Sequence, residues 1–413
     1  MEIRKLRNEE FEDSLSLSEY AFQYKVSGED RVRAREKFKP DQIWGLFEGD
    51  GIGAQLTLLP LQACIQGRPV SMGGIAGVAT WPENRRQGYV AHLLTHALKT
   101  MNENGQTLSF LHPFLIPFYR KFGWEIYCEY KKYTIPVGKF PQKTEIQGTV
   151  KRGTPDIAVF QQLYNTFAMR YNGTLLRTEQ WWKERVLDED THRGVFYSEQ
   201  GEPEGYVLYK IVNQELIIDE FIYVNELARQ GLWTFLANHD SMLTAAQLKL
   251  VPADDILPFL LPDPRIAQEN YPYFMARIVN AKAFVENMTF NVPEGDRERL
   301  LYIEDKHASW NNGLWRWNVS EQGEATFTQI QGERSEADLE CSIGTLTVLL
   351  MGYKRPHQAA RYGQLSGTAE ATAWLEALIP QAETALFDFS DRERLFPFPW
   401  KRRSFPIHNV SIQ

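Results

Sequence analysis

A turn that carries two adjacent arginines and a glycine offers the clearest chemistry in this sequence. Arg85, Arg86, Gln87 and Gly88 follow an apolar run at 70–80 and precede apolar residues at helical spacing. Because the first backbone N–H groups of a helix have no intrahelical partner, such a turn presents donors beside two guanidinium groups. The pattern therefore predicts a binding site for a phosphate or pyrophosphate.

The spacing of the glycines distinguishes between known phosphate-binding turns. A dinucleotide turn requires G-x-G-x-x-G between strand and helix, whereas Gly73, Gly74 and Gly77 lie before or within the predicted strand. A P-loop requires G-K-[ST] at the start of the helix, and this turn has none. The plainest alternative is a strand–helix–strand core unit whose arginine pair is merely solvated.

Other residues with chemical potential give weaker patterns. His92 and His96 are four apart on the predicted helix, but no H-E-x-x-H glutamate accompanies them, so the sequence indicates no metal site. There is no G-x-S-x-G, which leaves serine hydrolysis unsupported. The basic run at 401–403 is too short to indicate nucleic-acid binding and is expected to be a solvated surface segment.

Composition limits the possible classes of protein. The chain has 413 residues, 43% of them hydrophobic, which is long enough for two or three packed domains. Its formal net charge of −8 does not favour a nucleic-acid partner. Three scattered cysteines, Cys64, Cys128 and Cys341, argue against a disulfide framework. With no signal peptide and no membrane-length apolar run, we expect a cytoplasmic protein without a membrane partner.

Residues 1–137 are expected to form one α/β unit with a mixed sheet. Antiparallel hairpins followed by a crossover helix differ from a doubly wound, all-parallel fold. The expected elements are a strand at 2–6, helices at 8–24 and 29–38, a hairpin of strands at 42–47 and 52–59, the strand of 70–80, the helix after Gly88, a further strand, a short aromatic helix, and a last strand region at 124–136.

Two more units are expected to follow. Residues 138–290 hold helices and strands in a similar order, but no arginine-glycine turn follows their strands, so this unit is expected to lack a cofactor of its own. Residues 291–413 change character, with short strands, helices near 342–351 and 369–378, and a tail at 390–413. The apolar pieces of the third unit could line a lipid tunnel, although such stretches are more often simply core.

The turn and a second signature resemble the GCN5-related N-acetyltransferases. That signature is FYRKFGW at 118–124; relatives usually have Gly or Ala where this chain has Val90. With three units in this order, the chain is similar to the enhanced intracellular survival (Eis) family, in which a catalytic acetyltransferase domain, a degenerate second one and a sterol-carrier-protein-2-like α+β domain follow one another. The matching stretches are VATWPENRRQG, PFYRKFGW, GTLLRTEQWW, HDSM, LPFLLPDPR, RIVNA, WNNGLWRW and SIGTLTVLLMGY.

The resemblance implies a reaction and a set of residues for it. Family members acetylate amines, including aminoglycosides, with acetyl-CoA and without a metal, and they assemble as hexamers. The implied acid for the leaving thiolate is Tyr119 on the aromatic helix, and a strand-edge amide at 78–80 would face the thioester carbonyl. The implied cofactor-binding residues are Val78, Ala79, Thr80, Arg85, Arg86, Gln87, Gly88, Tyr89, Val90, Ala91, Phe114 and Leu115. By itself, Tyr119 would be interpreted as a packed core aromatic, and its place within FYRKFGW is what favours the acid role.

The end of the chain departs from the family pattern. Family members stop at an acidic-aromatic pair whose terminal carboxylate acts as the base, and the matching pair here is Asp388 and Phe389, implied to bind substrate. Twenty-four further residues follow Phe389. Three proton acceptors therefore stay open: the side chain of Asp388, the carboxylate of Gln413, or water. The first or the third is favoured, because tails of this composition more often lie on the surface.

Two functions of different classes remain from the sequence. The first is an acetyl-CoA-dependent N-acetyltransferase that acts on a small-molecule or peptidic amine, such as an aminoglycoside, a polyamine or a lysine. The second is a non-enzymatic protein that binds CoA or a lipid. Release of free CoA thiol would distinguish the two, and the complete phosphate turn favours the first.

Overall fold

A computed structural model describes residues 1–49 and 51–388 of the chain. They divide into two compact units. The first holds Met1–Thr57 and Ala76–Val90, and the second holds Leu58–Ile75 and the described residues from Ala91 onward. The boundary passes through three regular elements, namely β3 (Gly51–Ile65), β4 (Arg68–Thr80) and α3 (Tyr89–Glu103).

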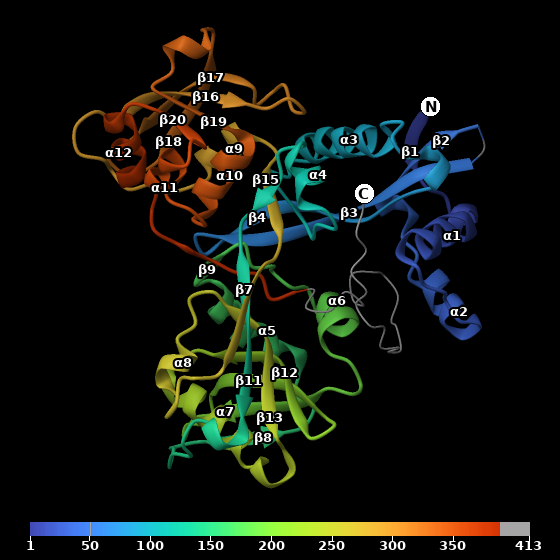
Figure 1. The fold of residues 1–413 in the computed structure, drawn as a ribbon, viewed down its shortest axis with the longest axis vertical. Coiled ribbons are helices and arrows are strands. Elements are labelled where there is room, and N and C mark those ends of the chain that lie inside the picture. Colours follow the sequence, from blue (N-terminus) through green and yellow to red (C-terminus); the bar gives the residue numbers. More distant parts are fainter. Residues whose placement is uncertain (50, 389–413) are drawn as a thin grey trace. The chain divides into compact units, whose positions relative to one another are not determined.

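The first unit is built on antiparallel strands and two helices. β1 (Glu2–Lys5) pairs with β2 (Ile43–Glu48), and β2 pairs with the first part of β3. Helix α1 (Phe11–Phe22) packs on this sheet through Leu17, and helix α2 (Gly28–Glu36) packs on α1 through Ala34; both are dark blue in Figure 1. These elements confirm the N-terminal strand, the two helices and the hairpin predicted from the sequence.

The second unit contains the remainder of the first sheet. The strand order of the whole sheet is β1-β2-β3-β4-β5-β15-β6. Its other strands are β5 (Leu108–Leu111), β15 (Met275–Ile278) and β6 (Glu125–Ile126), and the short aromatic helix α4 spans Ile116–Arg120. Helix α3 buries residues three and four apart, namely Leu93, Leu94, Ala97, Leu98 and Met101, which is the pattern that predicted it.

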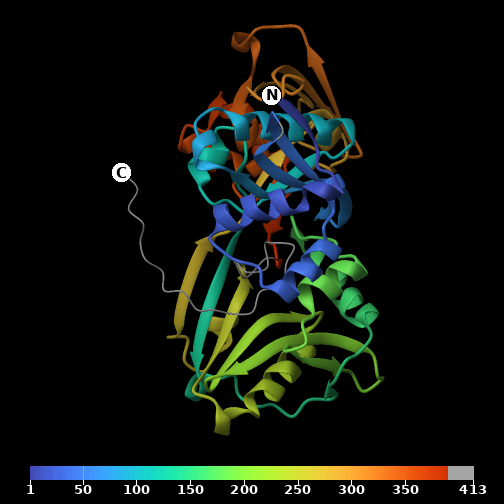
Figure 2. The same ribbon diagram turned by 90° about the vertical axis from the view of Figure 1, so that its right-hand side faces the viewer.

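A second mixed sheet lies wholly within the second unit, and Figures 1 and 2 show its long strands side by side. Its order is β14-β7-β13-β12-β11-β10-β8, and only β12 and β13 run parallel. The strands are β7 (Glu129–Pro136), β8 (Thr149–Arg152), β10 (His192–Tyr197), β11 (Pro203–Val212), β12 (Glu215–Tyr223), β13 (Ala245–Pro252) and β14 (Ala267–Pro272).

Helices cover both faces of this second sheet. α5 (Ile157–Ala168) packs on the side chains of Tyr206 and Leu208, and α7 (Glu226–Ala237) packs on those of Val207 and Tyr209. Because successive strand residues point to opposite faces, the middle of β11, from Gly205 to Tyr209, is buried on both sides. The segment after α5 forms a short α6 (Glu179–Trp181) and a π-turn at Trp182–Val186.

Two strands are exchanged between the sheets. The predicted strand region at 124–136 is split into β6, which stays in the first sheet, and β7, which pairs in the second sheet. In return, β15 enters the first sheet between β5 and β6. The crossing is held where the Tyr127 amide donates to Phe274 and the Tyr273 amide donates to Cys128. The sequence-based prediction placed residues 129–136 in the first domain, whereas they pair in the second sheet. The sequence could not indicate this, because no turn residue marks the point between β6 and β7 where the chain changes sheets.

A third sheet follows, in the order β18-β17-β16-β19-β20. Its strands are β16 (Glu298–Glu304), β17 (Gly313–Val319), β18 (Ala325–Ile330), β19 (Leu339–Ser342) and β20 (Leu365–Gly367), and its helices are α9 (Ala281–Glu286), α10 (Ile343–Met351), α11 (Pro356–Arg361) and α12 (Ala369–Leu378). Helix α9 packs on β18, so residues 281–290 belong with this sheet although the prediction placed them in the second domain.

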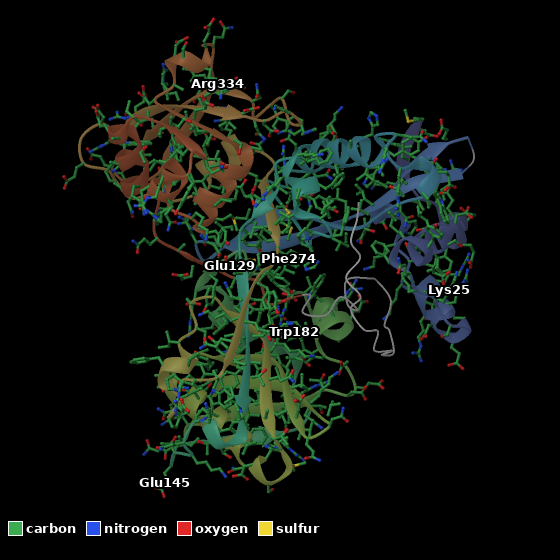
Figure 3. The ribbon with its side chains drawn as sticks, in the orientation of Figure 1. Lys25, Glu129, Glu145, Trp182, Phe274 and Arg334 are labelled. Atoms are coloured by element: carbon green, nitrogen blue, oxygen red, sulfur yellow. The ribbon has the colours of Figure 1, made fainter. Side chains whose placement is uncertain are left out.

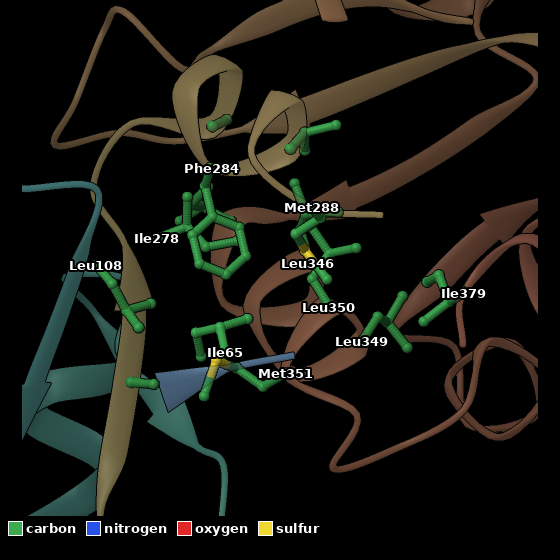
Figure 4. Close-up of a cluster of buried hydrophobic side chains, with 14 of the residues drawn as sticks. Ile65, Leu108, Ile278, Phe284, Met288, Leu346, Leu349, Leu350, Met351 and Ile379 are labelled. Carbon is green, nitrogen blue, oxygen red and sulfur yellow. The ribbon is translucent and has the colours of Figure 1, made fainter. Parts of the chain in front are cut away.

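Helix α10 joins the third sheet to the first. All nine of its residues are buried, and its Ser342 N-cap accepts a hydrogen bond from the Thr345 amide at 3.1 Å. Figure 4 shows leucines of α10 in one cluster with Ile65, Leu108 and Ile278 of the first sheet. The apolar stretch at 342–351 is therefore core in this structure.

Two further properties bear on the class of the protein. Cys64, Cys128 and Cys341 are buried and form no disulfide. Of the helices in residues 1–49 and 51–388, none has the length and apolar character needed to cross a membrane.

Candidate active site

The predicted phosphate turn lies in the first unit and has an uncommon backbone conformation. Arg86 has a φ of 63° and Gly88 a φ of 82°, and Arg86 is one of only five non-glycine residues with positive φ among those described. Alternation of left-handed residues in a turn directs successive N–H groups to one side, which makes an anion-binding concavity. The side chains of Arg85, Arg86 and Gln87 are exposed, so both arginines are available to a ligand.

Tyr89, the first residue of α3, anchors this turn. Its buried ring occupies the space over Gly53, where an added Cβ would lie 2.8 Å from the ring. Its hydroxyl donates to the carboxylate of Glu48, and this hydrogen bond raises the pKa of the phenol. Tyr89 therefore positions the turn with its side chain, and only its backbone amide remains for a cofactor.

The strand edge predicted to face the thioester follows an irregularity in β4. Gly77 has a φ of 59° inside the strand, directly before Val78. A left-handed residue within a strand interrupts the regular ladder and can leave a neighbouring amide unpaired. Ala79 is buried, whereas Val78 and Thr80 are partly exposed. The geometry suits the predicted donor at 78–80.

Tyr119 lies in the second unit and is almost fully buried, with 2% exposure. Its ring is in edge contact with Phe114 at 5.4 Å and with Phe118 at 5.2 Å between centroids. Burial raises the pKa of its phenol, so the hydroxyl stays protonated at neutral pH and can act as a donor. Phe114 and Leu115 are 70% and 51% exposed, which leaves two apolar side chains beside this helix for a ligand.

The FGW corner after α4 is held by a buried arginine that sequence reasoning missed. A Cβ on Gly123 would lie 2.0 Å from a terminal nitrogen of Arg277, so only glycine fits there. Arg277 donates to the carbonyl of Phe122 and, at 2.8 and 2.9 Å, to the carboxylate of Asp305. Arg277 has no exposed surface and Asp305 only 3%. The second signature thus owes part of its shape to residues of β15 and of the third domain.

Asp388, predicted to bind substrate or accept a proton, has its carboxylate in a buried network of the second unit. Arg177 donates from Nε at 3.1 Å and Trp181 from Nε1 at 2.7 Å. Proton transfer to Asp388 would break its ion pair with Arg177. A carboxylate held in this way is poorly suited to the predicted role as a base. Phe389 and Gln413 lie outside the described residues. Arg177 and Trp181 stand in the GTLLRTEQWW stretch, but the sequence gave no sign of their partner.

The second acetyltransferase-like domain has no comparable phosphate turn at the helix that follows its central strand. The side chain of Asn225 caps α7 by accepting from the Ala228 amide at 2.9 Å. Glu226 adds a negative charge in the first turn. Because the capping side chain and the carboxylate take the place of an anion, this helix start is unsuited to a phosphate.

The paired histidines on α3 do not converge with other ligands. His92 is exposed and His96 half-buried, and burial lowers the pKa of His96. Within the described ranges, no three side chains of His, Cys, Asp or Glu are grouped closely enough to hold a metal ion.

Comparison with protein families divides the chain into three parts. Residues 2–127 match an acetyltransferase (GNAT) domain, and residues 173–278 match a second one. Residues 281–387 match a sterol carrier protein domain. The first match contains both the phosphate turn and Tyr119.

Relatives match over nearly the whole chain. An N-acetyltransferase of Streptomyces avermitilis is 23% identical over 361 residues, or 81% of this chain and 84% of its own. A solved probable N-acyltransferase from Enterococcus faecalis is 29% identical with a TM-score of 0.86, covering 94% of this chain and 99% of its own. Eis1 from Mycobacterium abscessus has the same fold, with a TM-score of 0.78 at 19% identity over 94% and 100% of the two chains. The chain is therefore an acetyltransferase of the GCN5-related (GNAT) superfamily, with two GNAT domains followed by a sterol carrier protein domain, and it shares the fold of Eis1.

Proposed function

We propose that the enzyme transfers the acetyl group of acetyl-CoA to an amine of a small-molecule or peptidic substrate by direct attack of the amine on the thioester. Candidate substrates are aminoglycoside-like compounds, polyamines and lysine side chains. The family membership supports acetyl transfer, and the phosphate turn supports CoA as the carrier. The turn carries this proposal, because its two left-handed residues and two exposed arginines precede a helix start.

Three groups of this chain would each perform one part of the reaction. Arg86 and the first amides of α3 would bind the pyrophosphate. An amide at Val78–Thr80 would donate to the carbonyl oxygen as it becomes negative. Tyr119, whose phenol is kept protonated by burial, would give its proton to the departing thiolate.

The amine must lose a proton before or during its attack. Asp388 is engaged by Arg177 and Trp181, so we propose that solvent water accepts this proton. Water suffices for an amine that is partly deprotonated at the working pH. Catalysis should then rise with pH as more of the substrate amine becomes neutral.

The phosphate turn is tested by variants that remove its geometry or its charge. Gly88→Val places a β-branched residue at a φ of 82°, which is strained for such a side chain. Arg86→Glu reverses a charge beside the pyrophosphate, where charge-assisted hydrogen bonds are worth about 1.5–3 kcal/mol. We expect calorimetry to show at least tenfold weaker acetyl-CoA binding in both variants.

The matched control for these variants is Arg33→Glu on α2, which makes the same charge change at an exposed arginine outside the turn. It should bind acetyl-CoA as the wild type does. Wild-type affinity in a folded Arg86→Glu or Gly88→Val protein would refute the assignment of the turn.

We also propose that the enzyme is a homo-oligomer, with a hexamer as the expected state. β14 forms the outer edge of the second sheet and all six of its residues are exposed, as is 84% of Phe259 on α8 (Leu257–Leu260). An open strand edge invites pairing with a second copy. An antiparallel pair centred between Glu269 and Asn270 would put each glutamate opposite an asparagine, without charge repulsion.

Light scattering tests the assembly. At micromolar concentration we expect a mass several times the 47.8 kDa of one chain. Asn270→Pro, which removes an edge N–H donor, should lower that mass if β14 is the interface. A mass near 47.8 kDa for the wild type would contradict the proposal.

The non-enzymatic alternative is not favoured. A lipid carrier needs an apolar cavity, whereas every residue of α10 is buried, and its leucines lie in the core shown in Figure 4. Release of CoA thiol with a panel of amines would support the enzymatic proposal, and CoA binding without turnover of any amine would count against it.

A further inference from the structure

Residues 383–388, here called the docked segment, enter the second acetyltransferase-like domain. Strand β21 (Glu383–Thr384) pairs in parallel with β9 (Tyr171–Asn172), and the amide of Ala385 donates to the carbonyl of Asn172 at 3.2 Å. Ala385 and Phe387 are buried in the aromatic cluster between α5 and β11, which also holds Trp182, labelled in Figure 3. The second domain thus binds a piece of its own chain.

The last described residue of this segment is held most firmly. The carboxylate of Asp388 is 4% exposed and accepts from Arg177 and Trp181. Arg177 is fully buried at its side chain and also donates to Glu220, from Nη1 at 3.1 Å and from Nη2 at 2.5 Å. The hydroxyl of Tyr206 donates to Glu220 at 2.8 Å. Such a charge-assisted network tolerates few alternative geometries.

The backbone of Asp388 meets the first domain. Its carbonyl accepts a hydrogen bond from the hydroxyl of Tyr273, whose ring lies 5.7 Å from that of His112. His112 stands in the loop from β5 to α4, two residues before Phe114, and the ring of Phe114 contacts Tyr119. A path of contacts therefore runs from Arg177 through Asp388 and Tyr273 to His112, in the loop that precedes α4, the helix of the proposed acid.

In the second domain, the side chain of Asn225 caps the start of α7, at the place where an anion would otherwise accept from the helix amides. We propose that this domain acts as a clamp for the docked segment, and that Arg177, Trp181 and Tyr273 are positioning residues that fix the β5–α4 loop for acetyl transfer. The proposal rests on the proposed function. The β5–α4 loop leads to Tyr119 and also holds Phe114 and Leu115, which are predicted to lie near the cofactor. Loss of the clamp should therefore lower kcat and raise the KM of the amine and that of acetyl-CoA.

Tyr273→Phe and Trp181→Phe are the sharpest variants, since each removes one donor to Asp388 and retains an aromatic ring. Tyr127→Phe is the matched control, because this buried tyrosine also donates its hydroxyl to a backbone carbonyl, that of Gly173 at 3.0 Å. Asp388→Asn is a further variant that keeps the shape of the side chain and leaves Arg177 paired with Glu220. Melting curves establish that each variant is folded.

Two measurements are made on each full-length variant. Thiol release with acetyl-CoA and an aminoglycoside, spermine or a lysine peptide gives kcat and both KM values. Hydrogen exchange followed by mass spectrometry reports the docked segment independently of activity. For Tyr273→Phe and Trp181→Phe we expect kcat/KM for the amine to fall on the order of tenfold, because small misplacements are costly in catalysis. The KM of acetyl-CoA should rise as well, through Phe114 and Leu115, and exchange at 383–388 should increase.

The outcomes separate the clamp from the proposed function. Faster exchange with unchanged kcat and amine KM would overturn the positioning role, and so would a loss no larger than that of Tyr127→Phe. If the wild type turns over none of the amines, the proposed function fails, and exchange alone then decides: unchanged exchange at 383–388 in both variants would overturn the clamp as well.

Discussion

Replacement of Tyr119 by phenylalanine is expected to lower kcat by about a hundredfold or more, with little change in the KM of acetyl-CoA. General acid catalysis by a positioned side chain typically contributes 10²–10⁴-fold. The substitution removes only the hydroxyl, and the ring keeps its contacts with Phe114 and Phe118. Steady-state kinetics by thiol release measures the effect.

The control for this substitution is Tyr353→Phe, which removes a hydroxyl that donates to Glu129 instead. It should retain wild-type kcat. Burial raises the pKa of Tyr119 above the ordinary phenol value of about 10. The wild-type kcat should therefore not fall through ionisation of this phenol at a pH below that value. A Tyr119→Phe enzyme with kcat within twofold of the wild type would exclude the acid role.

Asp305→Asn is expected to cost roughly 3–5 kcal/mol of stability, the usual effect of leaving one member of a buried ion pair without its partner. The change keeps the size of the side chain but removes the charge that compensates Arg277. The Asp305 carboxylate also accepts from the amides of His307 and Ala308, each at 3.1 Å, so the loop at 305–311 should loosen too. Denaturant unfolding measures the loss.

The comparison for this variant is Glu103→Gln, which breaks the exposed pair with Lys99 on α3. Exposed pairs contribute little, so its unfolding midpoint should stay near that of the wild type. The double change Arg277→Met with Asp305→Leu should recover much of the loss, since replacing both partners leaves no charge unpaired. Equal unfolding midpoints for Asp305→Asn and the wild type would contradict a structural role for the pair.

Much of the fold followed from short-range patterns. The spacing of apolar residues on α3 and the hairpin of β2 and β3 each depend on residues a few positions apart. The phosphate turn is of the same kind, because its arginines, its glycine and the helix that it begins are contiguous at 85–103. The order of three signatures along the chain then indicated the family and the three-domain fold.

Other features arise only when distant segments meet. Nothing in residues 124–136 indicates that the chain changes sheets there, because both halves are equally suited to a strand and the partners, β15 and β13, lie more than a hundred residues away. The same holds for Asp388. The sequence predicted that it binds the substrate, whereas in the structure its carboxylate pairs with Arg177, 211 residues earlier in the chain.

The sequence by itself thus determined which elements form, where the phosphate turn lies and which superfamily the chain joins, since these depend on local conformational preference and apolar periodicity. Tertiary structure alone decided that Arg277 meets Asp305, that β7 and β15 exchange sheets and that the second domain binds residues 383–388. The physical reason is burial: a charged group can leave water only where a partner from another segment compensates it, and which segment does so is fixed when the chain packs.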